Sequence, residues 1–255
     1  MTETYGVCGN MKTLMISDIH ANEPALDAVL EDAGNYDRLV FLGDLANFGP
    51  HPSECVEKLK SLNPVCIIGN HDEQIVSETP ENFWDKWSKT KLSQEQQGWI
   101  AGFHESLVLD GHILLVHGSY SVEYDILPNT PNEDIVEAFK NLVTPEIDQV
   151  WFGHYHYQID RLIGGVEYHC IRPVGHHRDK DTRASYSVYE DGKITHKRVP
   201  YNLNKTIEDF KKSDAFEDMK LKEQFVAFLE NAYEEDLLKK DIKQMKLNEQ
   251  KAGKN

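Results

Sequence analysis

The chain has 255 residues, 40% of them hydrophobic, and a formal net charge of −16. This length fits one large α/β domain, or a domain of about 200 residues with an appendage. No run of about 18 apolar residues occurs, which excludes a membrane-spanning helix, and the acidic excess disfavours long nucleic acids, whose affinity depends on lysine and arginine contacts to phosphate.

The first half of the chain alternates between short apolar runs and amphipathic segments. We expect strands at 12–17, 38–42 and 65–68, and helices at 24–33 and 52–61, with Asn22 as the N-cap of the first helix. This β-α-β-α-β order predicts a parallel sheet layered by helices. The polar stretch 73–103 predicts two helices, one of them at 93–102.

The second half changes pattern along its length. A strand region at 107–116 is interrupted by the hairpin turn Asp110-Gly111, and a helix at 132–142 and a strand at 149–152 follow. Four antiparallel strands are then expected at 158–163, 166–171, 185–190 and 193–199. A parallel half followed by an antiparallel half predicts an α/β fold with two sheets facing each other and helices outside.

The last 50 residues differ in composition from the rest. They are rich in lysine and glutamate, and apolar residues recur at helical spacing, namely Leu221, Phe225, Phe228 and Leu229, and then Leu238, Ile242 and Met245. We expect residues 1–200 to form one domain and residues 201–255 a helical extension that packs on it. A homo-oligomer contact through this tail, or a lid over the functional site, are the alternatives.

Two further features concern the cellular compartment. Residues 1–10 lack the apolar stretch of a signal peptide, and the four cysteines show no C-x-x-C spacing. We therefore expect a cytoplasmic protein with free thiols.

Five short motifs carry the chemistry. They occur in the order D-x-H at 18–20, GD at 43–44, GNHD at 69–72, VHG at 116–118 and GHYH at 153–156, each after a short apolar run. Each run reads as a strand, and open α/β sheets place ligands in the crevice at the carboxyl ends of their strands. The motifs offer more carboxylate, amide and imidazole ligands than one metal ion can use. This inventory predicts a two-metal site for phosphoryl chemistry.

The individual positions differ in what they can do. Asp18 and His20 alternate along an extended loop and can face one ion, and Asp44, alone on a tight turn, is the natural bridge between two ions. Asp72 can either orient His71 or cap the helix that follows. Imidazole, carboxylate and one amide suit Mn²⁺, Fe²⁺, Zn²⁺, Co²⁺ or Ni²⁺ better than Ca²⁺.

The motif series resembles that of the calcineurin-like metallophosphoesterase superfamily, from residue 11 to about 199, and is most similar to its small bacterial and archaeal phosphodiesterases. The resemblance implies a four-layer α/β/β/α sandwich of two mixed sheets, with the helical tail added to it. It also implies two divalent ions, with Mn or Fe the expected metals. By family role Asp44 bridges the ions and His71 is the catalytic histidine, with Asp72 as its expected support. The other implied ligands are Asp18, His20 and His156 for the first ion, and Asn70, His117 and His154 for the second.

One loop departs from the family pattern. Relatives usually carry an N-P-G-S-like turn before a G-x-P-R segment, whereas residues 170–178 read CIRPVGHHR. The substrate contacts expected in this loop are Arg172, His176, His177 and Arg178. Pairing of Arg178 and Arg183 with Asp179 and Asp181 is the structural alternative. The resemblance implies hydrolysis of a small phosphoester or nucleotide, as a phosphodiesterase or dinucleotide polyphosphate hydrolase. A phosphomonoesterase, including a protein phosphatase, and a non-catalytic scaffold on the same fold are the alternatives.

Overall fold

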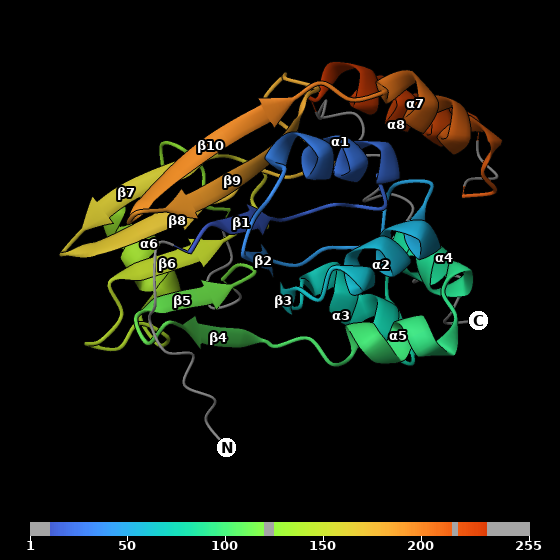
Figure 1. Ribbon diagram of the computed structural model, residues 1–255. Helices are drawn as coiled ribbons and strands as arrows, with labels where there is room; N and C mark the ends of the chain where they lie inside the picture. Colours follow the sequence, from blue (N-terminus) through green and yellow to red (C-terminus); the bar gives the residue numbers. More distant parts are fainter. Residues whose placement is uncertain (1–10, 120–124, 216–218, 234–255) are drawn as a thin grey trace.

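Two five-stranded sheets form the frame of the molecule (Figure 1). The structure is a computed structural model, and it describes residues 11–119, 125–215 and 219–233. In the first sheet the strand order is β10 (Lys193–Val199), β9 (Ala184–Glu190), β1 (Thr13–Ile16), β2 (Arg38–Phe41) and β3 (Val65–Cys66). In the second it is β4 (Ser106–Leu109), β5 (Ile113–Val116), β6 (Gln149–Phe152), β8 (Val166–Cys170) and β7 (Ile159–Ile163).

Each sheet mixes parallel and antiparallel pairs. β1, β2 and β3 are parallel, and so are β5, β6 and β8, whereas the hairpin β9–β10 adds to the first sheet and β4 and β7 lie antiparallel at the edges of the second. The antiparallel half expected from the sequence is therefore divided between the two sheets rather than gathered in one.

Alternation of side chains along the strands gives four layers. In β1, Leu14 and Ile16 belong to the core under helices α1 (Glu23–Ala33) and α2 (Pro52–Ser61), while Met15 packs between the sheets with Trp151. In β5, Ile113 and Leu115 belong to the inter-sheet core, and Leu114 and Val116 pack under α6 (Asn132–Phe139). Successive side chains of a strand point to opposite faces of its sheet, and both faces are covered here. Every residue of β1 and β5 is therefore buried. The predicted four-layer α/β/β/α sandwich is confirmed.

The stretch between β3 and β4 differs from the prediction. It holds three helices, α3 (Asn70–Val76), α4 (Phe83–Lys91) and α5 (Gln94–Ile100), where two were expected. The two-helix prediction was wrong because the first helix begins inside the GNHD motif, with Gly69 as its N-cap. Asn70 and His71 therefore lie in the first turn of a helix rather than on a loop.

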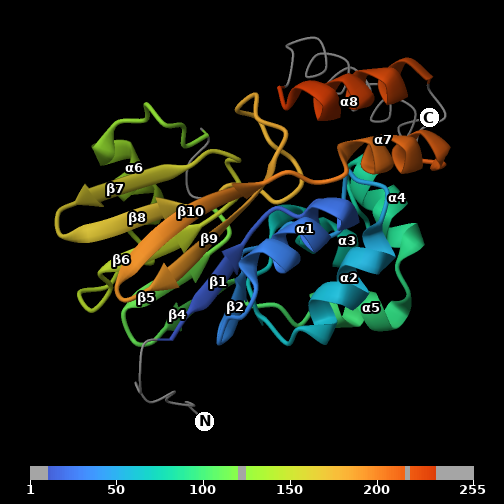
Figure 2. The same cartoon turned by 45° about the horizontal axis from the view of Figure 1, so that its top comes forward.

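Within residues 200–215 and 219–233, which the structure describes, two helices follow β10, α7 (Leu203–Lys212) and α8 (Met219–Asn231). They share an apolar cluster with α4 that includes Trp84, Phe210 and Phe225, and Figure 2 shows them together at the end of the sandwich nearest α4. Asn22, the N-cap of α1, accepts a hydrogen bond from Thr206 Oγ1 of α7 at 2.9 Å. The division of the chain at residue 200 stays a prediction, and the helical expectations for Leu238, Ile242 and Met245 lie outside the described residues.

Two smaller expectations concern the cysteines and the membrane. Cys55, Cys66 and Cys170 are free and buried. Residues 1–10, which include Cys8, lie outside the described residues, so the expectation for them stays a prediction. Among the residues described, no helix has the length and apolar content needed to cross a bilayer.

Candidate metal centre

The five motifs meet where the central strands end. β1, β2 and β6 end one or two residues before their motifs and β5 ends at Val116, the first residue of its motif, and parallel strands bring these ends to one edge of the sandwich. The backbone there is strained. Positive φ angles, rare for residues with a side chain, occur at the following motif residues: Asp18 (52°), His20 (49°), Asp44 (63°), His154 (68°) and His156 (63°). Such strain persists where the surrounding structure enforces it, and it concentrates at functional sites.

The first group of candidate ligands is Asp18, His20 and His156. Their ligand atoms lie within 4.8 Å of one another. His156 Nε2 is 3.2 Å from Asp18 Oδ1 and 3.1 Å from His20 Nε2. All three side chains are at most 3% exposed, so water cannot fully solvate them.

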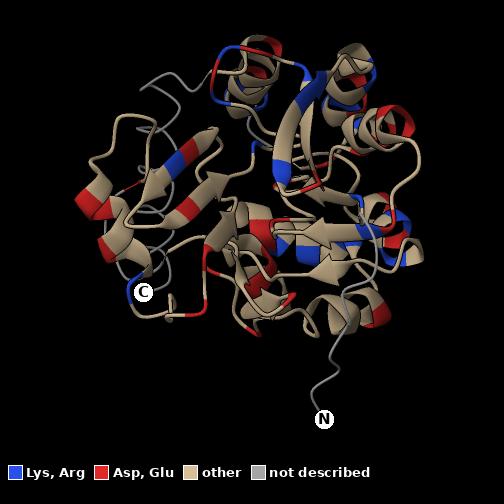
Figure 3. Cartoon of the chain, turned by 60° about the vertical axis from the view of Figure 1, so that its left-hand side comes forward, with Lys and Arg blue, Asp and Glu red and all other residues tan. Residues whose placement is uncertain are grey.

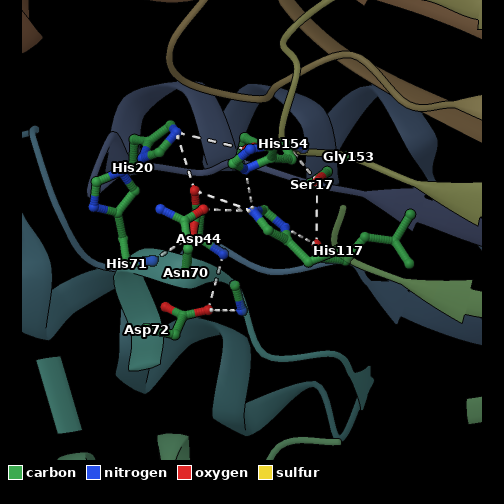
Figure 4. A network of polar contacts seen from close by, with 12 residues as sticks. Ser17, His20, Asp44, Asn70, His71, Asp72, His117, Gly153 and His154 are labelled. Carbon is green, nitrogen blue, oxygen red and sulfur yellow. Dashed lines mark hydrogen bonds and ion pairs between the residues drawn. The ribbon is translucent and has the colours of Figure 1, made fainter. Parts of the chain in front are cut away.

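The second group is Asp44, His117 and His154, whose ligand atoms also lie within 4.8 Å of one another. His117 Nε2 lies 3.3 Å from Asp44 Oδ2, 3.2 Å from His154 Nδ1 and 3.3 Å from the side-chain oxygen of Asn70. Figure 4 shows His20, His117 and Asn70 converging on Asp44.

Asp44 is shared between the groups. The same oxygen, Oδ2, lies 3.3 Å from His117 Nε2 of the second group and 4.0 Å from His20 Nε2 of the first. Close approach of the chain at this point needs glycine, since a Cβ on Gly69 would lie 2.2 Å from Asp44 Oδ1. Asp44 therefore has the position that a bridging carboxylate needs.

The far ring nitrogens of two histidines are held in place. His20 Nδ1 donates to Asn47 Oδ1 at 2.5 Å, and His117 Nδ1 donates to the Leu42 carbonyl oxygen at 2.5 Å. In the neutral ring these bonds fix the tautomer that leaves Nε2 with a lone pair, as metal-ligating histidines require. Asn47 is buried and was not among the predicted site residues, although it lies only three residues after Asp44.

Titration of the imidazoles follows from burial and charge. Burial, together with the neighbouring His156, lowers the pKa of His20 to about 3, and burial and His117 lower that of His154 to about 4. Burial also holds the pKa of His156 well below its ordinary value, with the charge of Arg178 adding to the effect. These imidazoles are neutral near pH 7, which is the form that binds metal.

Asp44 and His117 behave as a coupled pair. Burial would raise the pKa of Asp44, but His117 and His71 outweigh it and hold the pKa well below its usual range. Burial would lower the pKa of His117, yet the Asp44 carboxylate raises it to about 10. Each group therefore stabilises the charged form of the other, and a metal ion would take over the role of the imidazolium as the charge partner of Asp44.

The residues present fit a metal ion. Asp18 Oδ1 is buried without a hydrogen-bond partner among the described residues, and it faces the nitrogens of His20 and His156. Buried polar atoms are rarely left unpaired, because each costs about 1–3 kcal/mol. A cation between these atoms removes that cost, and a donor set of imidazole, carboxylate and amide suits a transition metal.

His71 and Asp72 have different surroundings. His71 Nδ1 donates to Asp85 of α4, at 3.0 Å from Oδ1 and 3.2 Å from Oδ2, while its backbone N–H donates to Asp44 Oδ1 at 3.0 Å. Burial would lower the pKa of His71, but Asp44 and Asp85 outweigh it and raise the pKa. The neighbour that orients His71 is therefore Asp85, fully buried, which no sequence pattern pointed to.

Asp72 takes the capping alternative. Its carboxylate accepts from the backbone N–H groups of Gly69 (3.0 Å), Asp44 (2.8 Å) and Leu45 (2.9 Å). It thus caps α3 and ties the GNHD turn to the GD turn, below Asp44 in Figure 4. Burial and the nearby Asp44 raise the pKa of Asp72 to about 7.

The expected substrate contacts separate into two sets. His176 lies beside the first ligand group, with its ring centre 5.0 Å from that of His20 and 5.1 Å from that of His156. The charge of Arg178 is close enough to depress the pKa values of His156 and His176.

The other set contacts protein groups of its own loop. Arg172 Nε lies 3.4 Å from Asp179 Oδ2, and buried His177 contacts the Val174 carbonyl oxygen at 3.2 Å. Arg183 pairs with Asp181 at 2.7 Å, as the structural alternative expected for it. Asp179 pairs with Arg172 and Arg198.

Comparison with known proteins decides the family. The model of the calcineurin-like phosphoesterases matches residues 11–158, which include all five motifs. The chain belongs to this family. It is a metal-dependent phosphoesterase with two candidate groups of metal-binding residues, and the resemblance seen in the sequence is confirmed.

Three proteins similar to this phosphoesterase come from a bacterium and two archaea. An uncharacterized protein of Methanocaldococcus jannaschii is 28% identical over 227 residues, 78% of this chain and 91% of that protein. The crystal structure of a metallophosphoesterase from Sphaerobacter thermophilus is 27% identical with a TM-score of 0.73, covering 88% of this chain and all of that one. A hypothetical protein from Pyrococcus horikoshii shares the fold, with a TM-score of 0.75 at 19% identity, over 88% of this chain and 99% of its own.

Proposed function

We propose that this phosphoesterase is a dinuclear phosphodiesterase or dinucleotide polyphosphate hydrolase that acts on small nucleotides. The observation that carries the proposal is the single Asp44 oxygen shared by two ligand groups, with His71 hydrogen-bonded to the same carboxylate through its backbone. Two ions held in this way can contact both the attacking and the leaving oxygen of an in-line displacement.

Each side chain has a role in this proposal. Asp18, His20 and His156 would hold the first ion, Asn70, His117 and His154 would hold the second, and Asp44 would be shared by both. When bound, the ions lower the pKa of water and neutralise charge on the phosphoryl oxygens. Mn or Fe is the proposed metal, with Zn, Co and Ni as the alternatives.

His71 supplies the proton for the leaving oxygen. Its raised pKa favours the protonated form of the imidazole, and the bond from Nδ1 to Asp85 leaves Nε2 as the donor. A general acid near its pKa contributes about 10²–10⁴ in rate. Asp72 supports the site by holding the backbone of Asp44 and Gly69, and not by contact with His71.

The surroundings fit a reacting phosphate group that carries a single charge. In the 172–183 loop, Arg172 and Arg183 pair with aspartates, and the charge of Arg178 lowers the pKa of His156 in the first ligand group. A phosphodiester carries one charge on its phosphate and a monoester two, so few cations favour the diester. On the side shown in Figure 3, Lys and Arg positions lie among Asp and Glu positions rather than in one continuous band, as a long nucleic acid would need.

The test is a substrate panel on metal-stripped protein with Mn²⁺ added back. We expect bis-p-nitrophenyl phosphate to be cleaved faster than p-nitrophenyl phosphate, and diadenosine tetraphosphate to be cleaved as well. Preference for the monoester would replace the proposal with a phosphomonoesterase. No cleavage of any of the three by protein holding two ions would contradict it.

A further inference from the structure

The loop between β8 and β9 is anchored to the metal-binding turn at its start. The backbone N–H of Val174 donates to the Ser17 carbonyl oxygen at 2.9 Å, and that of Gly175 to the Asp18 carbonyl oxygen at 3.1 Å. A Cβ at Gly175 would lie 2.0 Å from the Ile19 carbonyl oxygen, so this approach requires glycine. The loop thus lies directly on the D-x-H turn.

A second anchor lies farther along the loop, on helix α8. The backbone N–H of Lys180 donates to the Ala232 carbonyl oxygen at 2.9 Å, just beyond the end of the helix. The Lys180 ammonium lies 4.7 Å from the centre of the Tyr233 ring, within the range of a cation–π contact. Residues 176–180 are therefore held between the metal-binding turn and α8.

An aromatic stack connects α8 with the site. The His176 ring stacks on Phe228 of α8, with centres 4.1 Å apart and planes at 27°, and on Phe48 at 4.8 Å and 26°. Phe48 in turn lies edge-on to His71 at 4.9 Å. Both Phe228 and His176 are buried, so the stack has little room to shift.

The anchored segment faces the first ligand group. His176 contacts the rings of His20 and His156, and Arg178 follows two residues later. A long, rotamer-rich arginine binds an anion more tightly when its backbone is already fixed, because less entropy is lost on binding.

We propose that α8 is a positioning element of the active site, which acts through Phe228 and the Ala232 carbonyl to hold residues 176–180 so that Arg178 meets the substrate phosphate beside the Asp18–His20–His156 group. This inference rests on the proposed function and adds an element outside the matched residues 11–158. Phe228 is a positioning residue, and it has no direct contact with the substrate.

The test variant is Phe228→Leu, which keeps an apolar side chain and removes the ring from His176. In metal-loaded protein we expect the Kd for inorganic phosphate and the KM for bis-p-nitrophenyl phosphate to rise about tenfold, with kcat within about twofold and metal content unchanged. Hydrogen exchange at the Lys180 amide should accelerate about tenfold in metal-free protein as well, a readout independent of turnover.

A matched control is Phe210→Leu, which removes a buried ring from the same apolar cluster on α7. It should lower thermal stability without changing phosphate affinity. Arg178→Ala should weaken phosphate binding to a similar extent, and adding Phe228→Leu to it should cause little further loss, because both changes remove one interaction. Independent, additive losses would overturn the proposal.

Other outcomes also decide the matter. Unchanged phosphate affinity in Phe228→Leu, or a loss of metal in step with it, would overturn the proposal. If Phe228→Leu does not fold, Tyr233→Leu, an exposed position two residues beyond the end of α8, replaces it. The expected result is a two- to threefold rise in the phosphate Kd, and no rise would overturn the proposal. If the wild-type protein cleaves no phosphoester but Phe228→Leu still weakens phosphate binding, the proposed function fails and this inference stands.

Discussion

At the scale of single residues, the pair of His71 and Asp85 gives the sharpest prediction. His71→Ala should lower kcat by about 10²–10⁴, because the proton donor is lost, while metal content stays near the wild-type value. Asp85→Asn should lower kcat less, by about tenfold, because His71 keeps a hydrogen-bond partner but loses a charge that raises its pKa.

The pH profile tests the same pair. A general acid supports turnover while protonated, so activity falls as pH rises through its pKa. Because Asp85→Asn lowers the pKa of His71, the alkaline limb of kcat should move to lower pH, as measured with bis-p-nitrophenyl phosphate. An alkaline limb that does not move would contradict this assignment. So would a variant that combines His71→Ala with Asp85→Asn and is much slower than His71→Ala alone.

Asp44 carries the second prediction at this scale. Asp44→Asn removes the charge shared by the two ligand groups, whose nearest nitrogens lie 3.3 Å and 4.0 Å from it. We expect fewer than two ions per chain by elemental analysis, and loss of activity in proportion. Asp148→Asn, a change to an exposed carboxylate paired with His112, is the control. Full occupancy of both sites in Asp44→Asn would rule out the bridge.

At the scale of elements, the sequence predicted what depends on local patterns. Strand β6 and helix α2 have the expected positions, because apolar runs and Pro52 mark them directly. The start of α3 at Asn70 was missed, because a glycine N-cap gives no side-chain signal.

Partners that are distant in sequence were missed for another reason. Asp85 reaches His71 only because α4 packs beside α3, and Phe228 reaches His176 only because α8 lies over the loop. Neither contact leaves a periodicity or a spacing in the chain. The metal ligands, in contrast, could be found because each follows a strand, and strand ends converge by topology.

The element-scale prediction concerns Asp72, which joins two motif turns. Asp72→Asn keeps one acceptor oxygen for three backbone donors, so we expect a loss of about 2 kcal/mol in the free energy of unfolding. For a chain of this size that corresponds to a fall of about 4–8 °C in Tm, together with weaker metal binding. Glu73→Gln, at an exposed position on the same helix, should change neither. An unchanged Tm and metal affinity in Asp72→Asn would show that the bonds do not hold the turns.

At the scale of the whole molecule, a polar cluster joins the two sheets away from the metal centre. Asp160 on β7, at the edge of the second sheet, accepts hydrogen bonds from His196 on β10 of the first sheet at 3.0 Å and from His169 on β8 at 2.7 Å. Burial would raise the pKa of Asp160, but these hydrogen bonds outweigh it and hold the pKa well below 3.8. The cluster links the outer strands of both sheets and thereby helps to set their relative position.

The sign of its pH dependence follows from the lowered pKa. A carboxyl group whose pKa is lower in the folded state than in the unfolded state stabilises the fold at pH values above its unfolded-state pKa. This stability is lost as the pH falls toward the folded-state pKa. Asp160→Asn should therefore lower Tm by about 2–4 °C at pH 7, which corresponds to about 1 kcal/mol for a partly exposed group. The difference from wild type should shrink below about pH 4, in thermal unfolding followed by circular dichroism. The control Asp191→Asn, in the β9–β10 turn, should show no such trend. If the difference in Tm between Asp160→Asn and wild type stays constant from pH 7 to pH 3, the charge of Asp160 does not stabilise the contact between the sheets.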